Sequence, residues 1–256
     1  MKILALNGSH RGARGFTQVL LERMKAGVEE GGAEFECIAL AEKRISRCKG
    51  CEACHTAGNG FRCVFDGKDD AHAIFEAMRQ ADILIFATPI YVFAMSSLLK
   101  TLLERLNATA NVNELRVSRA GLLFHHIDTR LCSKPFVLVV TCGNMEKATP
   151  KNTIDYFRAY SRFMDAPMLA ALVRTGSFLL EEPDGPYLQK RNEVLGAYYE
   201  AGKDLACRRG VSAHHRKMAN LEIFRMPMIA RILLHIKPLG PKLVQKAMQR
   251  NVPRFD

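Results

Sequence analysis

Four of the eight cysteines lie within sixteen residues, at Cys48, Cys51, Cys54 and Cys63. The spacing Cys-x2-Cys-x2-Cys lets thiolates converge on one metal centre, and iron–sulfur clusters use it together with a more distant fourth cysteine. A zinc site favours two separated pairs of cysteines, and a redox disulfide between Cys51 and Cys54 is a further alternative. This cysteine group therefore indicates metal ligands, with zinc and a reactive disulfide left open.

A second group of residues with chemical potential is the loop NGSHRGARGFT, which runs from Asn7 to Thr17. It follows an apolar run and precedes a helical pattern, so its backbone N–H groups and the helix dipole would form an anion site. Ser9 and Thr17 can add hydroxyl donors, and Arg11 can add positive charge. The loop lacks the lysine of a Walker loop and the G-x-G-x-x-G of a dinucleotide site. It suits one terminal phosphate, as in FMN, although a plain Gly-rich turn is the alternative.

Two later loops could hold a flat ring. Pro89 fixes the backbone just past a buried apolar run, and Tyr91 and Phe93 offer aromatic surface. Gly143 follows another apolar run and would let the backbone approach a ring closely. Tyr91 alone could equally be a core aromatic, but its place after a strand favours a ligand.

The elements that must position these loops alternate along the chain. Apolar runs predict buried strands and helical spacing predicts a helix after each of them. Alternating strands and helices produce a parallel sheet that is covered on both faces, with ligands at the carboxyl ends of the strands. The connection at 107–134 is longer than usual, which is typical of a lid or an oligomer contact. The expected strands are 1–6, 35–40, 81–87, 136–141 and 168–173, and the expected helices are 16–30, 69–80, 95–106, 149–162 and 186–207.

Taken together, the first loop, the cysteine group and Pro89-Ile90-Tyr91 resemble the NADPH-dependent FMN reductase family, and within it the iron-sulfur flavoproteins. The resemblance implies a flavodoxin-like α/β fold, a doubly wound five-stranded parallel sheet with a cysteine-rich loop and a helical C-terminal extension. It also implies a [4Fe–4S] cluster on Cys48, Cys51, Cys54 and Cys63. The FMN contacts it implies are Ser9, Arg11, Gly15, Phe16, Thr17, Pro89, Ile90, Tyr91, Val92, Thr141 and Gly143.

The leading functional interpretation is an FMN-dependent oxidoreductase that passes electrons between FMN and a [4Fe–4S] cluster, with NAD(P)H as a candidate donor. A cluster-free NAD(P)H-dependent reductase of FMN or quinones is the first alternative. A flavodoxin-like electron carrier or regulatory flavin-binding module is the alternative without enzymatic activity. No side chain is assigned as a catalytic acid or base, because the cofactor carries the chemistry.

The charge of the chain divides it into two predicted parts. The net charge is +11, of which +9 falls in residues 207–256. We therefore expect an FMN-binding domain over 1–206 and a basic helical extension over 207–256. We expect the extension to pack on the domain or on a second copy of the chain in a homo-oligomer. Contact with an anionic membrane is a less favoured alternative. Nucleic-acid binding is not expected. The redox partner is not indicated. The short apolar start does not resemble a signal peptide, which predicts a cytoplasmic protein.

Overall fold

A computed structural model of the chain describes residues 1–56, 58, 62–181, 185–224, 228–229, 232, 236 and 240–242. At its centre are five parallel strands in the order β2-β1-β3-β7-β8, and the short strand β4 pairs antiparallel with the end of β3. This confirms the predicted α/β class and its doubly wound, flavodoxin-like strand order. The strands of this sheet are β1 (Lys2–Asn7), β2 (Glu34–Ala39), β3 (Ile83–Tyr91), β4 (Ala94–Met95), β7 (Phe136–Cys142) and β8 (Met168–Thr175).

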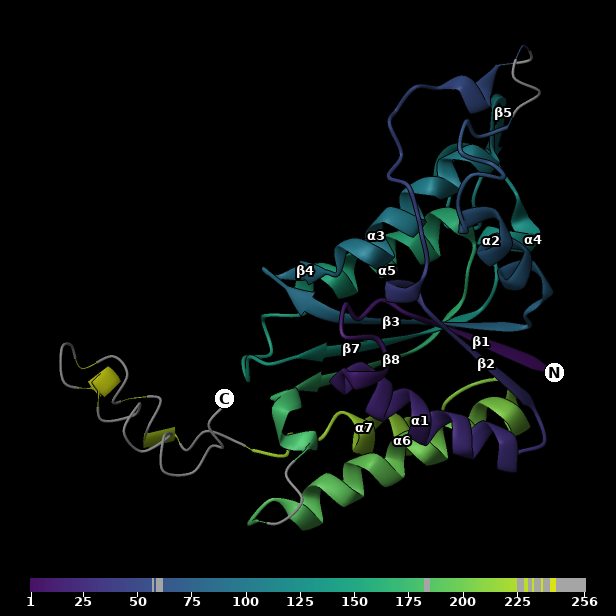
Figure 1. Cartoon of the computed structure of the whole chain (residues 1–256). Coiled ribbons are helices and arrows are strands. Elements are labelled where there is room, and N and C mark those ends of the chain that lie inside the picture. Colours follow the sequence, from purple (N-terminus) through teal and green to yellow (C-terminus); the bar gives the residue numbers. More distant parts are fainter. Residues whose placement is uncertain are drawn as a thin grey trace.

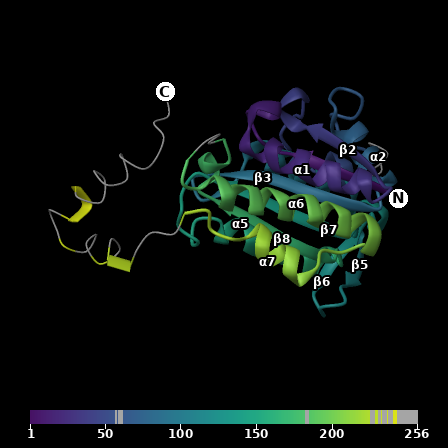
Figure 2. The same cartoon turned by 90° about the horizontal axis from the view of Figure 1, so that it is seen from below.

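Helices cover the sheet on both faces, as Figure 1 shows. One face carries α1 (Phe16–Glu30), α6 (Leu188–Arg208) and α7 (Ala213–Ala219), which lie side by side in Figure 2. The other face carries α2 (Ala71–Gln80), α3 (Ser97–Glu104) and α5 (Lys151–Met164). The central strands are buried from both sides, which explains why their sequences are continuously apolar rather than alternating.

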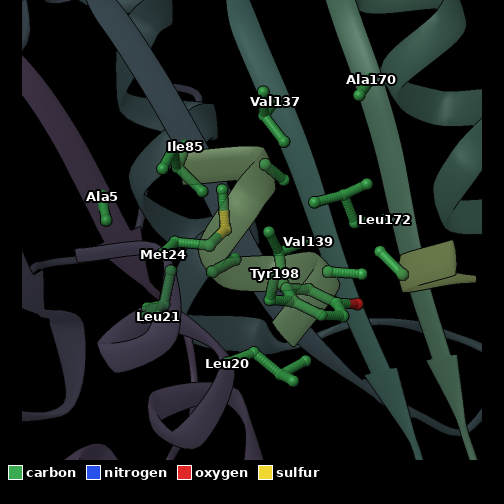
Figure 3. Packing of buried hydrophobic residues seen from close by; sticks show 14 of the residues in the cluster. Ala5, Leu20, Leu21, Met24, Ile85, Val137, Val139, Ala170, Leu172 and Tyr198 are labelled. Carbon is green, nitrogen blue, oxygen red and sulfur yellow. The ribbon is translucent and has the colours of Figure 1, made fainter. Parts of the chain in front are cut away.

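The packing of α1 against α6 and the sheet fixes the helix that follows the first loop. Leu20 and Met24 of α1 and Tyr198 of α6 point into one apolar cluster beneath the sheet (Figure 3). The two helices meet at glycines: a Cβ on Gly27 would lie 1.9 Å from the Tyr199 carbonyl oxygen, and one on Gly202 would lie 2.1 Å from that of Met24. The helix backbones are therefore in direct contact, and α1 has little room to move.

The predicted helices 69–80 and 95–106 are wrong at their ends. Helix α2 begins only at Ala71, because the Asp69 side chain accepts hydrogen bonds from Ser46 N and Ala71 N at the boundary. Helix α3 begins at Ser97, because the Ser96 side chain accepts a hydrogen bond from Leu99 N and caps the helix, as short polar residues do. After Glu104 the chain tightens into a 3-10 helix over Arg105–Thr109.

The long connection 107–134 contains a β-hairpin that the sequence did not predict. Strands β5 (Ala110–Val117) and β6 (Leu123–Ile127) pair antiparallel, and the short helix α4 (Thr129–Cys132) follows. Their register shifts between Asn111 and Leu115, which breaks the two-residue alternation that would have marked a strand. The hairpin is tied to the C-terminal end of α5, where Arg119 N donates to Asp165 Oδ1 at 2.8 Å.

The chain beyond the expected boundary at 207 continues to pack on the sheet domain. Helix α6 ends at Arg208, α7 follows, and Ile223 is buried in the cluster beneath the sheet. The Asn220 side chain accepts from Val173 N at 2.6 Å and donates to the Ala171 carbonyl at 3.1 Å, so it pairs with the outer edge of β8. The part of the expected helical extension beyond residue 224 lies mostly outside the described residues. Within the described part of the chain, no helix has the length and apolar character needed to span a bilayer.

Candidate functional site

The loop after β1 forms a tight turn at the carboxyl edge of the sheet. Gly8 N donates to the Ala87 carbonyl at 2.8 Å, which ties the loop to β3, and Ser9 N donates to Asn7 Oδ1 at 2.9 Å. Gly15 then begins α1, and no side chain caps this helix end. A Cβ on Gly15 would lie 2.5 Å from Ser9 Oγ, so the glycine makes room for that hydroxyl. Gln18 N donates to the Gly15 carbonyl at 2.9 Å, which leaves the N–H groups of Phe16 and Thr17 in the first turn available to an anion.

Hydroxyl groups surround this helix end. Thr17 Oγ1 and Thr141 Oγ1 lie 2.9 Å apart, a hydrogen bond that joins α1 to the end of β7. One hydroxyl of such a pair donates to the other, so one proton stays free for a ligand. Ser9 Oγ accepts from Arg11 N at 3.2 Å, which likewise leaves its own proton free. The guanidinium of Arg11 is exposed and lies 5.7 Å from the ring of Phe16.

The segment after β3 turns back on itself beside this loop. The ring centroids of Tyr91 and His10 are 5.7 Å apart, and His10 Nε2 lies 3.0 Å from Ser97 Oγ at the start of α3. Val92 and Phe93 form the two-residue turn between β3 and β4, and both have positive φ, at 47° and 64°. A β-branched residue in this region is strained, and strained residues cluster at functional sites. Both side chains are exposed.

These loops enclose one hollow of about 500 Å³, including space open to solvent. Nine of the eleven predicted FMN contacts line this hollow. The other two do not: Gly15 lies against the Ser9 side chain, and Val92 has 91% of its surface exposed. The sequence missed Ser177, although a small polar residue just past β8 lies at the same sheet edge and could have been considered. The lining residues are Ser9, Arg11, Phe16, Thr17, Pro89, Ile90, Tyr91, Thr141, Cys142, Gly143 and Ser177.

The four clustered cysteines line a second hollow of about 340 Å³. Two residues between them, Gly50 and Glu52, have positive φ of 62° and 54°, so the chain coils tightly there. All four thiols are free. Burial raises the pKa of the Cys54 thiol, and the charges of Cys63, Cys48 and Cys51 raise it further.

The chemistry of this donor set fits an iron–sulfur cluster. In the described part of the chain, no three His, Cys, Asp or Glu side chains converge as they would on a single metal ion. A [4Fe–4S] cluster instead takes one thiolate at each iron, so its ligands surround a hollow rather than a point. Cys48, Cys51, Cys54 and Cys63 are the residues that would hold it.

Helix α3 separates the two hollows. Its first residue, Ser97, contacts His10 beside the first hollow, whereas Arg105, just past its end, lines the cysteine hollow. Eight residues of helix correspond to about 12 Å at 1.5 Å per residue. The cysteine segment is also anchored here, since His55 Nε2 donates to the Asn107 carbonyl at 3.2 Å.

Solved structures with the same fold include a quinone oxidoreductase and an azoreductase. An NAD(P)H:quinone oxidoreductase from Methanothermobacter marburgensis is 17% identical, with a TM-score of 0.56, and the match covers 80% of this chain and 94% of that chain. An FMN-dependent NADH-azoreductase from Bacillus anthracis in complex with FMN is 15% identical, with a TM-score of 0.55, over 82% and 99%. At these identities the likeness concerns the fold.

Curated relatives are more similar in sequence. An iron-sulfur flavoprotein from Archaeoglobus fulgidus is 33% identical over 143 residues, which are 56% of this chain and 60% of the relative. An iron-sulfur flavoprotein from Methanocaldococcus jannaschii is 35% identical over 105 residues, 41% of this chain and 51% of the relative. A putative NAD(P)H-dependent FMN-containing oxidoreductase from Bacillus subtilis, YwqN, is 39% identical over 109 residues, 43% and 54%. The chain thus spans half to three-fifths of the length of these relatives.

The family model for NADPH-dependent FMN reductases matches residues 1–149. That range holds the loop after β1, all four clustered cysteines, the β3–β4 turn and the end of β7. It includes the residues that line the cysteine hollow and all of those that line the first hollow except Ser177. The sequence match and the geometry agree, and the chain belongs to the NADPH-dependent FMN reductase family.

Proposed function

We propose that this protein is an FMN-dependent oxidoreductase that takes electrons from NAD(P)H and passes them singly to a [4Fe–4S] cluster held by its own cysteines. The observation that carries the proposal is the convergence of three loops, after β1, β3 and β7, around one hollow at the carboxyl edge of the sheet. Doubly wound sheets bind their ligands at this edge.

The phosphate of FMN would bind at the start of α1. One small anion could accept hydrogen bonds from the uncapped N–H groups of the helix and from the free hydroxyl protons of Ser9 and the Thr17–Thr141 pair. The charge of Arg11 would add to its binding. Among the described residues that line this hollow, the one cation is Arg11, and it is exposed, which agrees with a phosphate that is partly open to water.

The ring of FMN would lie between Pro89–Tyr91 and Thr141–Gly143. Among the described residues, no Asp, Glu, His or Lys lines the hollow, and we assign its side chains to binding and orienting the ring. FMN supplies the chemistry when bound, because it accepts a hydride and releases single electrons. Tyr91 and Phe16 would shield the ring from water, and the partial exposure of Tyr91 leaves one approach for a donor.

The cluster half of the proposal is supported by the cysteine hollow and by the iron-sulfur flavoproteins among the relatives. Anaerobically purified protein should contain FMN, and iron and acid-labile sulfide in nearly equal amounts. The change Cys51→Ala should remove iron and sulfide and leave FMN bound, whereas Cys132→Ala, at a buried cysteine outside both hollows, should remove neither. Zinc without sulfide in the anaerobic protein would contradict the cluster.

A cluster-free NAD(P)H-dependent reductase of FMN or quinones is the second candidate, and the similarity to YwqN favours it. An absorbance spectrum of the anaerobic protein separates the two, because a cluster adds a broad shoulder to the flavin bands. Flavin bands alone, with NADPH oxidation, would support the second candidate. Flavin bands without any oxidation of NADH or NADPH would instead support an electron carrier or a regulatory flavin-binding module.

A further inference from the structure

Arg105 is a buried cation at the cysteine hollow. It begins the 3-10 helix after α3, lines the hollow, and exposes only 2% of its side chain. Its Nη1 donates to Asp69 Oδ2 at 2.5 Å and to the Ser46 carbonyl at 3.1 Å. Its Nε is buried and has no hydrogen-bond partner among the described residues. A buried donor without a partner is costly, so the site is built for an acceptor that protein atoms do not supply.

Among the described residues, two cations, Arg105 and Lys49, and one carboxylate, Glu52, line the cysteine hollow. Burial lowers the pKa of Arg105, but hydrogen bonds with Asp69 and Cys63, together with the charges of these two residues, outweigh it and raise the pKa above its ordinary value. The ring of Phe65 lies 5.2 Å from the Arg105 guanidinium and 5.1 Å from Lys49 Nζ, and all three residues line the hollow. Arg105 is held in place and cannot withdraw to solvent, whereas Lys49 is exposed.

An iron–sulfur cluster with four thiolate ligands is an anion, and its reduction adds a further negative charge. Hydrogen bonds to its sulfurs, nearby charges and solvent exclusion set its reduction potential. A guanidinium fixed on a buried side chain favours the more negative state, because its charge is less screened there than in water. Two carboxylates oppose this effect because they neutralise part of the guanidinium charge: Asp69, and at longer range Asp66, whose Oδ1 lies 4.0 Å from Arg105 Nη2.

We infer that Arg105 is the residue that raises the reduction potential of the cluster, by a fixed positive charge and a free N–H at the cysteine hollow, and that Asp69 moderates it. This rests on the proposed function, because it requires the cluster. The cluster accepts one electron, which comes from reduced FMN in the proposed function and from the added reductant in a redox titration, and no bond to the cluster forms or breaks. Arg105 thereby makes the cluster a better acceptor of electrons from reduced FMN.

The test is an anaerobic redox titration of the full-length holoprotein, with the electron paramagnetic resonance signal of the reduced cluster as the readout. Arg105→Gln should shift the midpoint potential to a more negative value. Asp69→Asn should shift it to a more positive value, because the guanidinium charge is then unopposed. Arg105→Lys should fall between wild type and Arg105→Gln, since the charge remains and the Nε–H is lost. Arg79→Gln should change nothing; Arg79 pairs with Asp128 at 2.8 Å, away from the hollow.

Midpoint potentials that shift in opposite directions in Arg105→Gln and Asp69→Asn would indicate that Arg105 tunes the cluster. If the Arg105–Asp69 pair only anchored the Ser46 segment, both variants would lose the cluster. If Arg105→Gln fails to retain iron, the midpoint potentials of Arg105→Lys and Asp69→Asn, compared with wild type, still test the inference. Shifts of the same sign, or none, in a normally loaded cluster would overturn this inference alone. Wild-type protein that binds no iron after anaerobic reconstitution would overturn the cluster proposal and this inference with it.

Discussion

Ser9 and Thr17 are almost completely buried although they line a hollow, with 2% and 1% of their surface exposed. Their hydroxyls are held by Arg11 N and Thr141 Oγ1, so they are already oriented before any ligand arrives. Groups that are pre-oriented in this way lose little conformational freedom on binding. At the residue scale, the site therefore has few hydroxyl donors, and their orientation is already fixed.

Replacing both Ser9 and Thr17 with Ala should weaken FMN binding by about 2–3 kcal/mol, since a hydrogen bond to a charged group contributes about 1 kcal/mol or more. This corresponds to a rise in Kd of roughly 30- to 150-fold. The measurement is fluorescence titration of flavin-free protein with FMN. Ser133→Ala is the matched control, because Ser133 Oγ donates to the Met164 carbonyl at 2.5 Å, outside the hollow. An unchanged Kd for the double variant would refute the phosphate site.

Prediction from the sequence succeeded where candidate ligand-binding residues directly follow a continuous apolar run that forms a buried strand. The continuous apolar runs of β3 and β7 located the strands, and the residues just past them were therefore correctly expected to share one edge. Ser177 was missed because a lone serine carries no pattern of its own. The β5–β6 hairpin was missed because Val112, Leu115 and Val117 are exposed, so no buried face imposed a readable alternation. Arg105 could be predicted only as a helix residue, because its burial and its missing partner depend on the folded cysteine segment.

At the scale of elements, the contact between α1 and α6 depends on the absence of side chains. Gly27→Ala should lower the free energy of unfolding by about 1–3 kcal/mol, because its Cβ would overlap the Tyr199 carbonyl and force the helices apart. Gly196→Ala in the same helix pair is the control, since nothing lies within 4 Å of its Cβ. That change should raise stability by about 0.5–1 kcal/mol through helix propensity. Urea unfolding of both variants gives the comparison, and equal effects would contradict the close packing.

The docking of α7 on α6 depends on Asp204, which accepts from Ser212 N at 2.9 Å and pairs with His215 Nδ1 at 2.7 Å. Burial alone would raise the Asp204 pKa, but the hydrogen bonds of Ser212 and His215 outweigh it and hold the pKa below its ordinary value. A carboxyl with a lowered pKa stabilises the fold above its unfolded pKa of about 3.9, and this contribution is lost as pH falls through the folded pKa.

Amide hydrogen exchange in Ala213–Ala219 should therefore accelerate below about pH 4, after correction for intrinsic rates, and Asp204→Asn should produce the same acceleration at neutral pH. Asp155→Asn provides the control, because that carboxyl also has a lowered pKa, through hydrogen bonds from Lys151 and Arg158, but lies on the exposed side of α5. If α7 exchanges at the same rate in the Asp204→Asn protein, the carboxylate does not hold the helix.

At the scale of the whole molecule, the division of the chain into two parts remains a proposal: an FMN-binding domain over 1–206 and a basic extension over 207–256. The described part of the extension already packs on the domain through α7 and Ile223. Beyond it, Met228, Ile229, Ile232 and Ile236 are exposed. Apolar residues gathered in this way most often mark contacts between proteins, which supports a homo-oligomer; membrane contact is the alternative, and a cytoplasmic location stays a prediction.

We expect the full-length chain to be a dimer or larger by light scattering at high salt without detergent, because burial of apolar surface is little affected by screening. Deletion of residues 225–256 retains α7 and Asn220, so the shortened protein should fold and show a smaller oligomeric state. A shortened protein with an unchanged oligomeric state would count against packing through these residues. Salt-sensitive binding of the full-length chain to anionic vesicles would instead favour the membrane.

The pairing of Asn220 with β8 has a further consequence for how the protein behaves at high concentration. An open sheet has two edges whose unpaired backbone groups can recruit strands from other molecules and start aggregation. Here the amide of Asn220 occupies the Ala171 carbonyl and the Val173 N–H of one edge, as a neighbouring strand would. At the opposite edge, β2 places Glu34 and Glu36 beside Lys2, and charged side chains discourage strand addition. The sheet is thus protected at both margins, and Asn220→Leu should make the folded protein prone to amyloid-like assembly.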